Sequence, residues 1–213
     1  MRLGVLILAA IMLLGFAAAA QSMSKLKKKS LANDTWSPAI GTTLALGGTF
    51  ATFNPYLKSQ TIGFRDALQA DGHAKLHFDD YIQYLPGVSP LTLKLCGLES
   101  RHTFWRIALL EGTSYLFGAL LLNTAKYNLD VQRPDREAHN SFPSGHTFTA
   151  FTGAELVRLE YGECHPWVAA TAYAVAALVG FMRLYNNRHW MGDVMAGAGL
   201  AILCTNITYW ILD

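Results

Sequence analysis

Three basic side chains recur at fixed positions in the second half of the sequence. Lys126 precedes Arg133 by seven residues, and Arg183 follows further along the chain. Arginine binds tetrahedral oxyanions through a bidentate fork, and lysine adds a point charge. Three such cations brought to one place suit a compact anion with two or more charges. Phosphate fits this description, so the sequence predicts a phosphate site formed by Lys126, Arg133 and Arg183.

A short polar turn precedes an apolar helical segment in residues 141–151, SFPSGHTFTAF. The turn at Ser144 and Gly145 exposes backbone N–H groups, and the positive end of the helix dipole adds to their effect. Both features favour an anion, so Ser144 and Gly145 are predicted to complete the phosphate cradle. His146, when protonated, is placed to give a proton to a leaving oxygen.

His189 and Asp193 are four residues apart, a spacing that places two side chains on one face of a helix. A carboxylate there can hold one imidazole N–H and leave the other nitrogen to attack phosphorus. We therefore expect a phosphohistidine at His189 that water later hydrolyses, while the cations stabilise the equatorial oxygens. No cluster of carboxylates or thiolates in the sequence suggests a metal site, so no metal or other cofactor is expected.

Long apolar segments must position these residues. Helices are expected at 103–127, 143–162, 165–182 and 189–212, and Pro86 and Pro90 disturb a further helical segment at about 78–98. The helices on either side of the 162–165 turn have similar lengths, so His146 and Arg183 should lie at the same end of the hairpin. The sequence predicts an all-α bundle with helices near membrane-spanning length and a site at the membrane–water boundary.

The composition supports a membrane location. Charged residues make up 15% of the 213 residues, against about 25% in soluble domains. A net charge of +2 without a basic stripe argues against a nucleic-acid partner. Cys96, Cys164 and Cys204 have neither disulfide nor zinc spacing.

The chain divides into three predicted regions. Residues 1–20 are a signal peptide, with Ala18-x-Ala20 as the cleavage site, or an N-terminal membrane anchor. Residues 21–78 are predicted to form a basic linker followed by irregular structure with one or two short helices, because glycine, Pro55 and scattered charges interrupt the pattern. Residues 79–213 are predicted to form the catalytic helical domain.

The three polar segments together resemble the signature of the phosphatidic acid phosphatase type 2 family, within the superfamily of bacterial acid phosphatases and vanadium haloperoxidases. The matching motifs are Lys126-x6-Arg133-Pro134, Pro143-Ser144-Gly145-His146 and Arg183-x5-His189-x3-Asp193. The resemblance covers about residues 79–213 and implies an all-α bundle of about six helices.

The resemblance also implies a role for each matching residue. His189 is the nucleophile, Asp193 its partner and His146 the acid. The phosphate-binding residues are Lys126, Arg133, Ser144, Gly145 and Arg183. One position departs from the pattern, because Met182 stands where the third motif usually has a serine.

The implied function is a membrane-associated phosphatase that hydrolyses a phosphate monoester or pyrophosphate of a lipid without a metal. The expected location is the bacterial inner membrane with the site facing the periplasm, or a membrane-associated periplasmic position. In this topology residues 83–98 enter the membrane and 104–125 return. Phosphatidic acid, phosphatidylglycerol phosphate, undecaprenyl pyrophosphate and a lipid A phosphate all fit the motifs, which recognise the phosphoryl group alone.

Three other functions stay open at this point. The first is a soluble periplasmic acid phosphatase of broad specificity. The second is a vanadium-dependent haloperoxidase, because vanadate has the shape of a phosphoryl transition state. The third is a non-catalytic membrane protein that binds phosphate. The sequence identifies no protein partner.

Overall fold

The computed structural model describes residues 35–70, 72 and 74–213. The predicted signal peptide or anchor and most of the basic linker lie outside these residues. The described part contains helices and one isolated bridge between Val131 and Asn140. The helices are α2 (Trp36–Phe53), α3 (Pro55–Gln69), α4 (Asp79–Ile82), α5 (Leu85–Leu95), α6 (Phe104–Leu129), α7 (Gly145–Tyr161), α8 (Pro166–Tyr185) and α9 (Met191–Leu212). The all-α prediction is confirmed, with eight helices in the described residues instead of about six.

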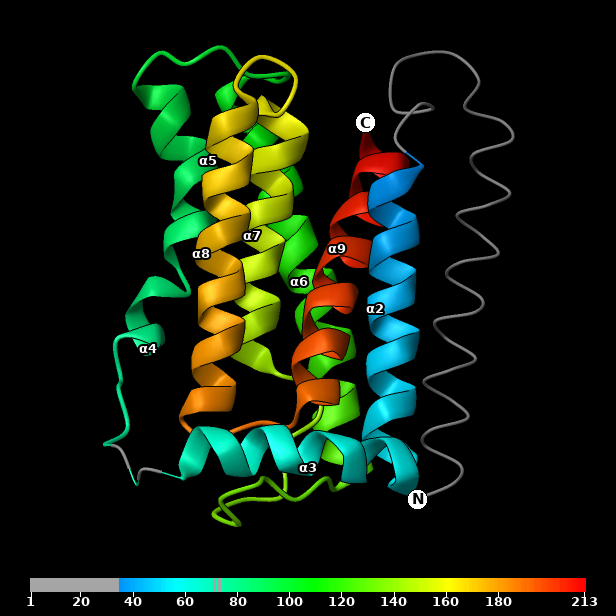
Figure 1. Cartoon of the computed structure of the whole chain (residues 1–213). Helices are drawn as coiled ribbons and strands as arrows, with labels where there is room; N and C mark the ends of the chain where they lie inside the picture. The colour runs from blue at the N-terminus through cyan, green and yellow to red at the C-terminus, as the bar shows by residue number, and fades with distance from the viewer. Residues whose placement is uncertain (1–34, 71, 73) are drawn as a thin grey trace.

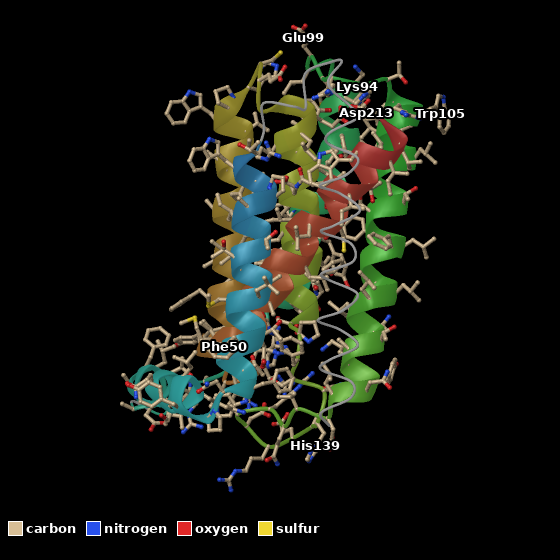
Figure 2. All side chains as sticks on the ribbon, turned by 90° about the vertical axis from the view of Figure 1, so that its right-hand side faces the viewer. Phe50, Lys94, Glu99, Trp105, His139 and Asp213 are labelled. Atoms are coloured by element: carbon tan, nitrogen blue, oxygen red, sulfur yellow. The ribbon has the colours of Figure 1, made fainter. Side chains whose placement is uncertain are left out.

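The long helices lie side by side, and α3 crosses one end of the bundle (Figure 1). The chain enters α7 and α9 and leaves α6 and α8 at this same end. His139, in the loop between α6 and α7, marks it, whereas Trp105 and Asp213 lie at the opposite end (Figure 2). The helix directions therefore bring the three predicted polar segments to one end of the bundle.

Among the described residues, three helices, α6, α8 and α9, are long and apolar enough to cross a membrane. Large apolar side chains also point outward from the bundle: Trp105, Leu116, Leu120, Trp167 and Ile211 are each more than 60% exposed. These features indicate a membrane protein. The segment predicted to enter the membrane, 83–98, does not form a membrane-spanning helix, because α5 has only 11 residues. At about 1.5 Å per residue it is too short to span a hydrocarbon core of about 30 Å.

The N-terminal region also differs from its prediction. Residues 36–53 form a continuous helix instead of irregular structure, and α2 packs along α9. A Cβ atom on Gly48 would lie 2.4 Å from the backbone nitrogen of Ala196, and one on Gly199 would lie 2.2 Å from that of Ala45. These glycines let two helix backbones approach closely, as in other membrane helix pairs. Helix α2 is therefore part of the bundle.

Helix α7 is buried at the centre of the bundle and carries a buried acid, Glu155. Its Oε1 atom accepts hydrogen bonds from Ser37 in α2 at 2.6 Å and from Asn206 in α9 at 2.6 Å. Arg158 donates to both carboxylate oxygens, at 2.7 and 2.8 Å. Because each oxygen has a donor, the charge can stay inside an apolar bundle, and it ties α2, α7 and α9 together.

Candidate active site

Four helix ends form the candidate site. Lys126 lies in the last turn of α6 and Arg183 in the last turn of α8, while Gly145 begins α7 and His189 precedes α9. The Nζ atom of Lys126 donates to the carbonyl of Asn140 at 2.8 Å. The Cε atom of Lys126 would lie 3.7 Å from a Cβ atom on Gly145, so the lysine side chain passes over the start of α7.

The turn before α7 is fixed by α9. The backbone N–H of Ser144 donates to the carbonyl of Asp193 at 3.0 Å. A Cβ atom on Gly197 would lie 2.5 Å from the carbonyl oxygen of Ser144, so this contact requires glycine. The hydroxyl of Ser144 pairs with that of Thr147 at 2.9 Å and does not cap the helix. The first N–H groups of α7 are thus left for another acceptor, such as an anion.

Two arginines of the predicted phosphate site have buried donors that are unused. The Nε atoms of Arg133 and Arg183 are buried and form no hydrogen bond within the described residues. The pKa of Arg133 is lowered by burial and by the charges of Arg188 and Arg183, with Asp135 and Glu137 opposing. Buried donors without acceptors are rare in folded proteins, and guanidinium N–H groups suit a tetrahedral oxyanion.

The loop that carries Arg133 is clamped by ion pairs. Arg188 donates to Asp135 at 3.0 Å and also to Glu137, and Lys75 approaches Glu137 at 3.0 Å. The backbone N–H of Arg133 donates to the carbonyl of Ala138 at 2.9 Å. These contacts hold the arginine near the ends of α6 and α8, even though it lies on a loop.

His189 is buried, and its Nδ1 atom lies 2.7 Å from the carbonyl oxygen of Ser141. A carbonyl only accepts, so Nδ1 carries the hydrogen and Nε2 has the lone pair. No hydrogen bond to Nε2 occurs among the described residues. Burial lowers the pKa of His189 to about 4, with Asp193 opposing and with Lys126 and Arg183 lowering it further. The imidazole is therefore neutral at neutral pH, the form in which a histidine can attack phosphorus.

Asp193 does not hold His189 directly, which differs from the sequence interpretation. Its Oδ2 atom is 3.8 Å from Nδ1 of His189, beyond hydrogen-bond distance. The spacing of four residues misleads here, because α9 begins at Met191 and His189 lies before it. The buried carboxylate instead accepts from the backbone N–H of Trp190 at 2.9 Å, from Thr52 at 3.0 Å and from the hydroxyl of Ser141. Asp193 thus reaches His189 through Ser141.

His146 has a carboxylate partner that the sequence interpretation missed. Its Nε2 atom lies 2.8 Å from Oδ1 of Asp80, and NH1 of Arg183 lies 3.2 Å from the same oxygen. Arg183 also donates to the buried Asp79. Burial raises the pKa of Asp80, but the hydrogen bond and charge of His146 and the charge of Arg183 outweigh burial and lower it. In the sequence, the sole indication of this contact is the pair of adjacent acids at 79–80. Such a pair is equally typical of the first turn of a helix.

Asp79, Asp80 and His146 bring their ligand atoms within 4.8 Å of one another, a spacing that a metal ion can use. However, NH1 of Arg183 donates to both carboxylates. The guanidinium places a fixed positive charge where a cation would bind, so this donor set fits arginine better than a metal ion. Met182, at the position of the usual serine, is buried in the bundle and offers no hydrogen-bond donor to the site.

Comparisons with known proteins agree with this architecture. A family model described as the PAP2 superfamily matches residues 107–213. The lipid A 1-phosphatase of Porphyromonas gingivalis is 40% identical over 144 residues, which are 66% of this chain and 32% of that protein. The chain thus spans about a third of the length of this relative.

Two solved structures are also similar. The crystal structure of Aquifex aeolicus LpxE has a TM-score of 0.54 and 22% identity, covering 70% of this chain and 94% of that one. A transmembrane PAP2-type phosphatidylglycerolphosphate phosphatase from Bacillus subtilis has a TM-score of 0.42 and 21% identity, covering 93% and 94%. The family model extends over half of the chain and includes all three polar segments, and on this basis the protein belongs to the PAP2 superfamily.

Proposed function

We propose that this protein is a membrane phosphatase that removes a phosphoryl group from a lipid through a phosphohistidine at His189. The observation that carries the proposal is the setting of that imidazole. Its Nδ1 atom is fixed on the carbonyl of Ser141, and burial lowers its pKa to about 4. A neutral, oriented imidazole beside buried guanidinium donors suits attack on a phosphorus atom.

The proposed reaction has two steps. In the first, Nε2 of His189 bonds to phosphorus, the bond from phosphorus to the lipid oxygen breaks, and His146 gives that oxygen a proton. In the second, water attacks the phosphohistidine, His146 takes a proton from the water, and inorganic phosphate leaves Nε2. The site cations stabilise the charge on the three equatorial oxygens. They supply the electrostatic stabilisation that a metal gives elsewhere, so we propose a metal-independent reaction.

A lipid is the proposed substrate because the site lies at one end of helices suited to a membrane. Exposed apolar side chains such as Leu116 and Leu120 cover the outer face of α6 and favour a lipid environment over water. The Porphyromonas gingivalis relative is a lipid A 1-phosphatase. The 1-phosphate of lipid A is therefore the first candidate substrate, and we propose that the site faces the periplasm of the inner membrane.

Phosphate release by the detergent-purified full chain tests the proposal. The substrates are lipid A, phosphatidic acid, phosphatidylglycerol phosphate, undecaprenyl pyrophosphate and a water-soluble aryl phosphate, each with EDTA present and with His189→Ala as the blank. Release that depends on His189 and favours one lipid supports the proposal and identifies the substrate. Equal or faster turnover of the aryl phosphate points instead to a broad-specificity acid phosphatase. No His189-dependent release contradicts a phosphatase, and vanadate-dependent halide oxidation would then test for a haloperoxidase.

A further inference from the structure

A carboxylate on α4 faces the histidine to which we assign the acid role. Asp80 lies 66 residues before His146, yet its Oδ1 atom is 2.8 Å from Nε2 of the imidazole. The same oxygen accepts from NH1 of Arg183 at 3.2 Å. A carboxylate that holds a histidine fixes the orientation of the ring and favours its protonated form. This arrangement is suited to an acid and differs from the carbonyl that holds His189.

The short helix α4 is itself well anchored. Asp79 is buried and accepts from Arg183 and, at 3.2 Å, from Asn186. Asn186 in turn donates to the carbonyl of Leu76 at 2.6 Å and accepts from its N–H at 2.9 Å. Four hydrogen bonds therefore hold α4 and the residues before it to the end of α8, and they fix where Asp80 meets His146.

We propose that Asp80 is a positioning residue that orients His146 for proton transfer to the leaving oxygen. With Nε2 facing Asp80, the Nδ1 atom of His146 is the nitrogen left to serve the leaving group. Arg183 links the positioning of His146 to phosphate binding, since its guanidinium contacts the carboxylate of Asp80 and belongs to the proposed phosphate cradle. The inference rests on the proposed phosphatase function and adds the residue that controls its acid.

Charged groups around His146 set the expected pH dependence. Burial and Arg183 lower the pKa of His146, and Asp80 and Asp79 oppose them. A proton donor works only below its pKa, so activity falls as the pH rises through that value. Without the Asp80 charge the pKa falls further, and this limb of the pH profile should move to lower pH.

The test compares Asp80→Asn with the wild-type protein on two substrates, a lipid phosphate and an aryl phosphate with a good leaving group. For the lipid, we expect kcat to fall about 10–100-fold with KM unchanged, the usual cost of losing such a partner. For the aryl phosphate, which needs little protonation, the rate of leaving-group release in a single turnover should change less than about threefold. Asp80→Glu should restore part of the lipid activity, and the high-pH limb of Asp80→Asn should shift to lower pH.

A matched control exists at the same end of the bundle. Asp130 also pairs with a histidine, His139, at 3.2 Å, but both side chains are exposed. Its backbone has a φ of 43°, which asparagine tolerates well, so Asp130→Asn should fold and keep full activity. Thermal unfolding of each variant in detergent separates a loss of fold from a loss of positioning.

Several outcomes would overturn the inference. Equal losses on both substrates, or no loss on either, would mean that Asp80 does not act through the acid. Faster turnover and tighter vanadate inhibition in Asp80→Asn would mean that the carboxylate competes with phosphate for Arg183 and His146. If the wild-type protein releases no phosphate that depends on His189, the proposed function itself is wrong. If the wild-type protein is active and Asp80→Asn has no effect, only the role of Asp80 is wrong.

Discussion

The two histidines of the site differ in what faces them. The Nδ1 atom of His189 meets a main-chain carbonyl, and its side chain is 3% exposed. The Nε2 atom of His146 meets the carboxylate of Asp80, and its side chain is 30% exposed. A carbonyl orients an imidazole without adding a charge, so burial keeps His189 neutral. Burial and Arg183 also hold the pKa of His146 below its usual value, but the carboxylate of Asp80 opposes them and favours the protonated ring. The same side chain can therefore serve as nucleophile in one place and as acid in the other.

The largest expected effect comes from removing the nucleophile. His189→Ala should lower turnover of every phosphate ester by at least about 10⁴-fold, because the covalent route then has no acceptor for the phosphoryl group. Phosphate release measured with the lipid and the aryl substrate checks this. His139→Ala, at the same end but on an exposed loop, serves as the control and should keep wild-type activity. A loss below about tenfold in His189→Ala would contradict the assignment of His189 as the nucleophile.

Removal of the acid should have a smaller and selective effect. His146→Ala is expected to lower kcat for a lipid phosphate by about 10²–10⁴-fold, because an alkoxide is a poor leaving group without a proton. For the aryl phosphate, the first step, formation of the phosphohistidine, should slow less than about tenfold. Release of the leaving group in a single turnover, measured with both substrates, gives the difference, because the second step also uses His146 and is common to both. The same loss for every leaving group would refute the acid role of His146.

A moderate effect is expected at Asp193. Asp193→Asn should lower kcat about 10–100-fold, because the carboxylate orients His189 through Ser141 and not by direct contact. It should also lower the thermal unfolding midpoint, since the buried donors of Thr52 and Trp190 lose a charged acceptor. A loss as large as that of His189→Ala would instead indicate a direct hydrogen bond between the two side chains during the reaction.

The smallest effect is expected when the pH is lowered moderately. The folded pKa of His189, about 4, is below the usual value of 6.5, so protonation inactivates the nucleophile only as the pH falls through about 4. Protonation of His189 should therefore cause little loss of kcat/KM between pH 7 and about pH 5. The free energy of unfolding should also fall as the pH is lowered from about 6.5 to 4. In this range the histidine of the unfolded chain binds a proton, whereas the buried His189 of the folded protein does not. An acid limb of kcat/KM near 6.5 would show that burial does not control His189.

The sequence predicted much of this end of the bundle. The helix directions and the shared level of His146 and Arg183 follow from the lengths of the apolar segments, because a helix of known length returns the chain to a known height. The structure places every predicted site residue at that end. Their positions could be predicted because most of these residues lie at or beside helix ends, where local pattern fixes position; their roles stay predictions.

Other parts could not be predicted, for distinct physical reasons. The contact between Asp80 and His146 joins residues 66 positions apart and depends on how α4 docks on α8, which no local pattern records. Gly48 was interpreted as an interruption, whereas its missing side chain lets α2 pack against α9. The spacing of His189 and Asp193 suggested a shared helix face, but the helix begins only at Met191.

The proposed mechanism is tested most directly by a search for the covalent intermediate. The wild-type protein is mixed with lipid A or the aryl phosphate, quenched in alkali within one turnover, and digested for mass spectrometry. A phosphoryl group on His189, absent in His189→Ala and accumulated in His146→Ala with the aryl substrate, is the expected result. Phosphate release at the wild-type rate with no phosphorylated histidine at any time would contradict the account, because water would then attack the substrate directly.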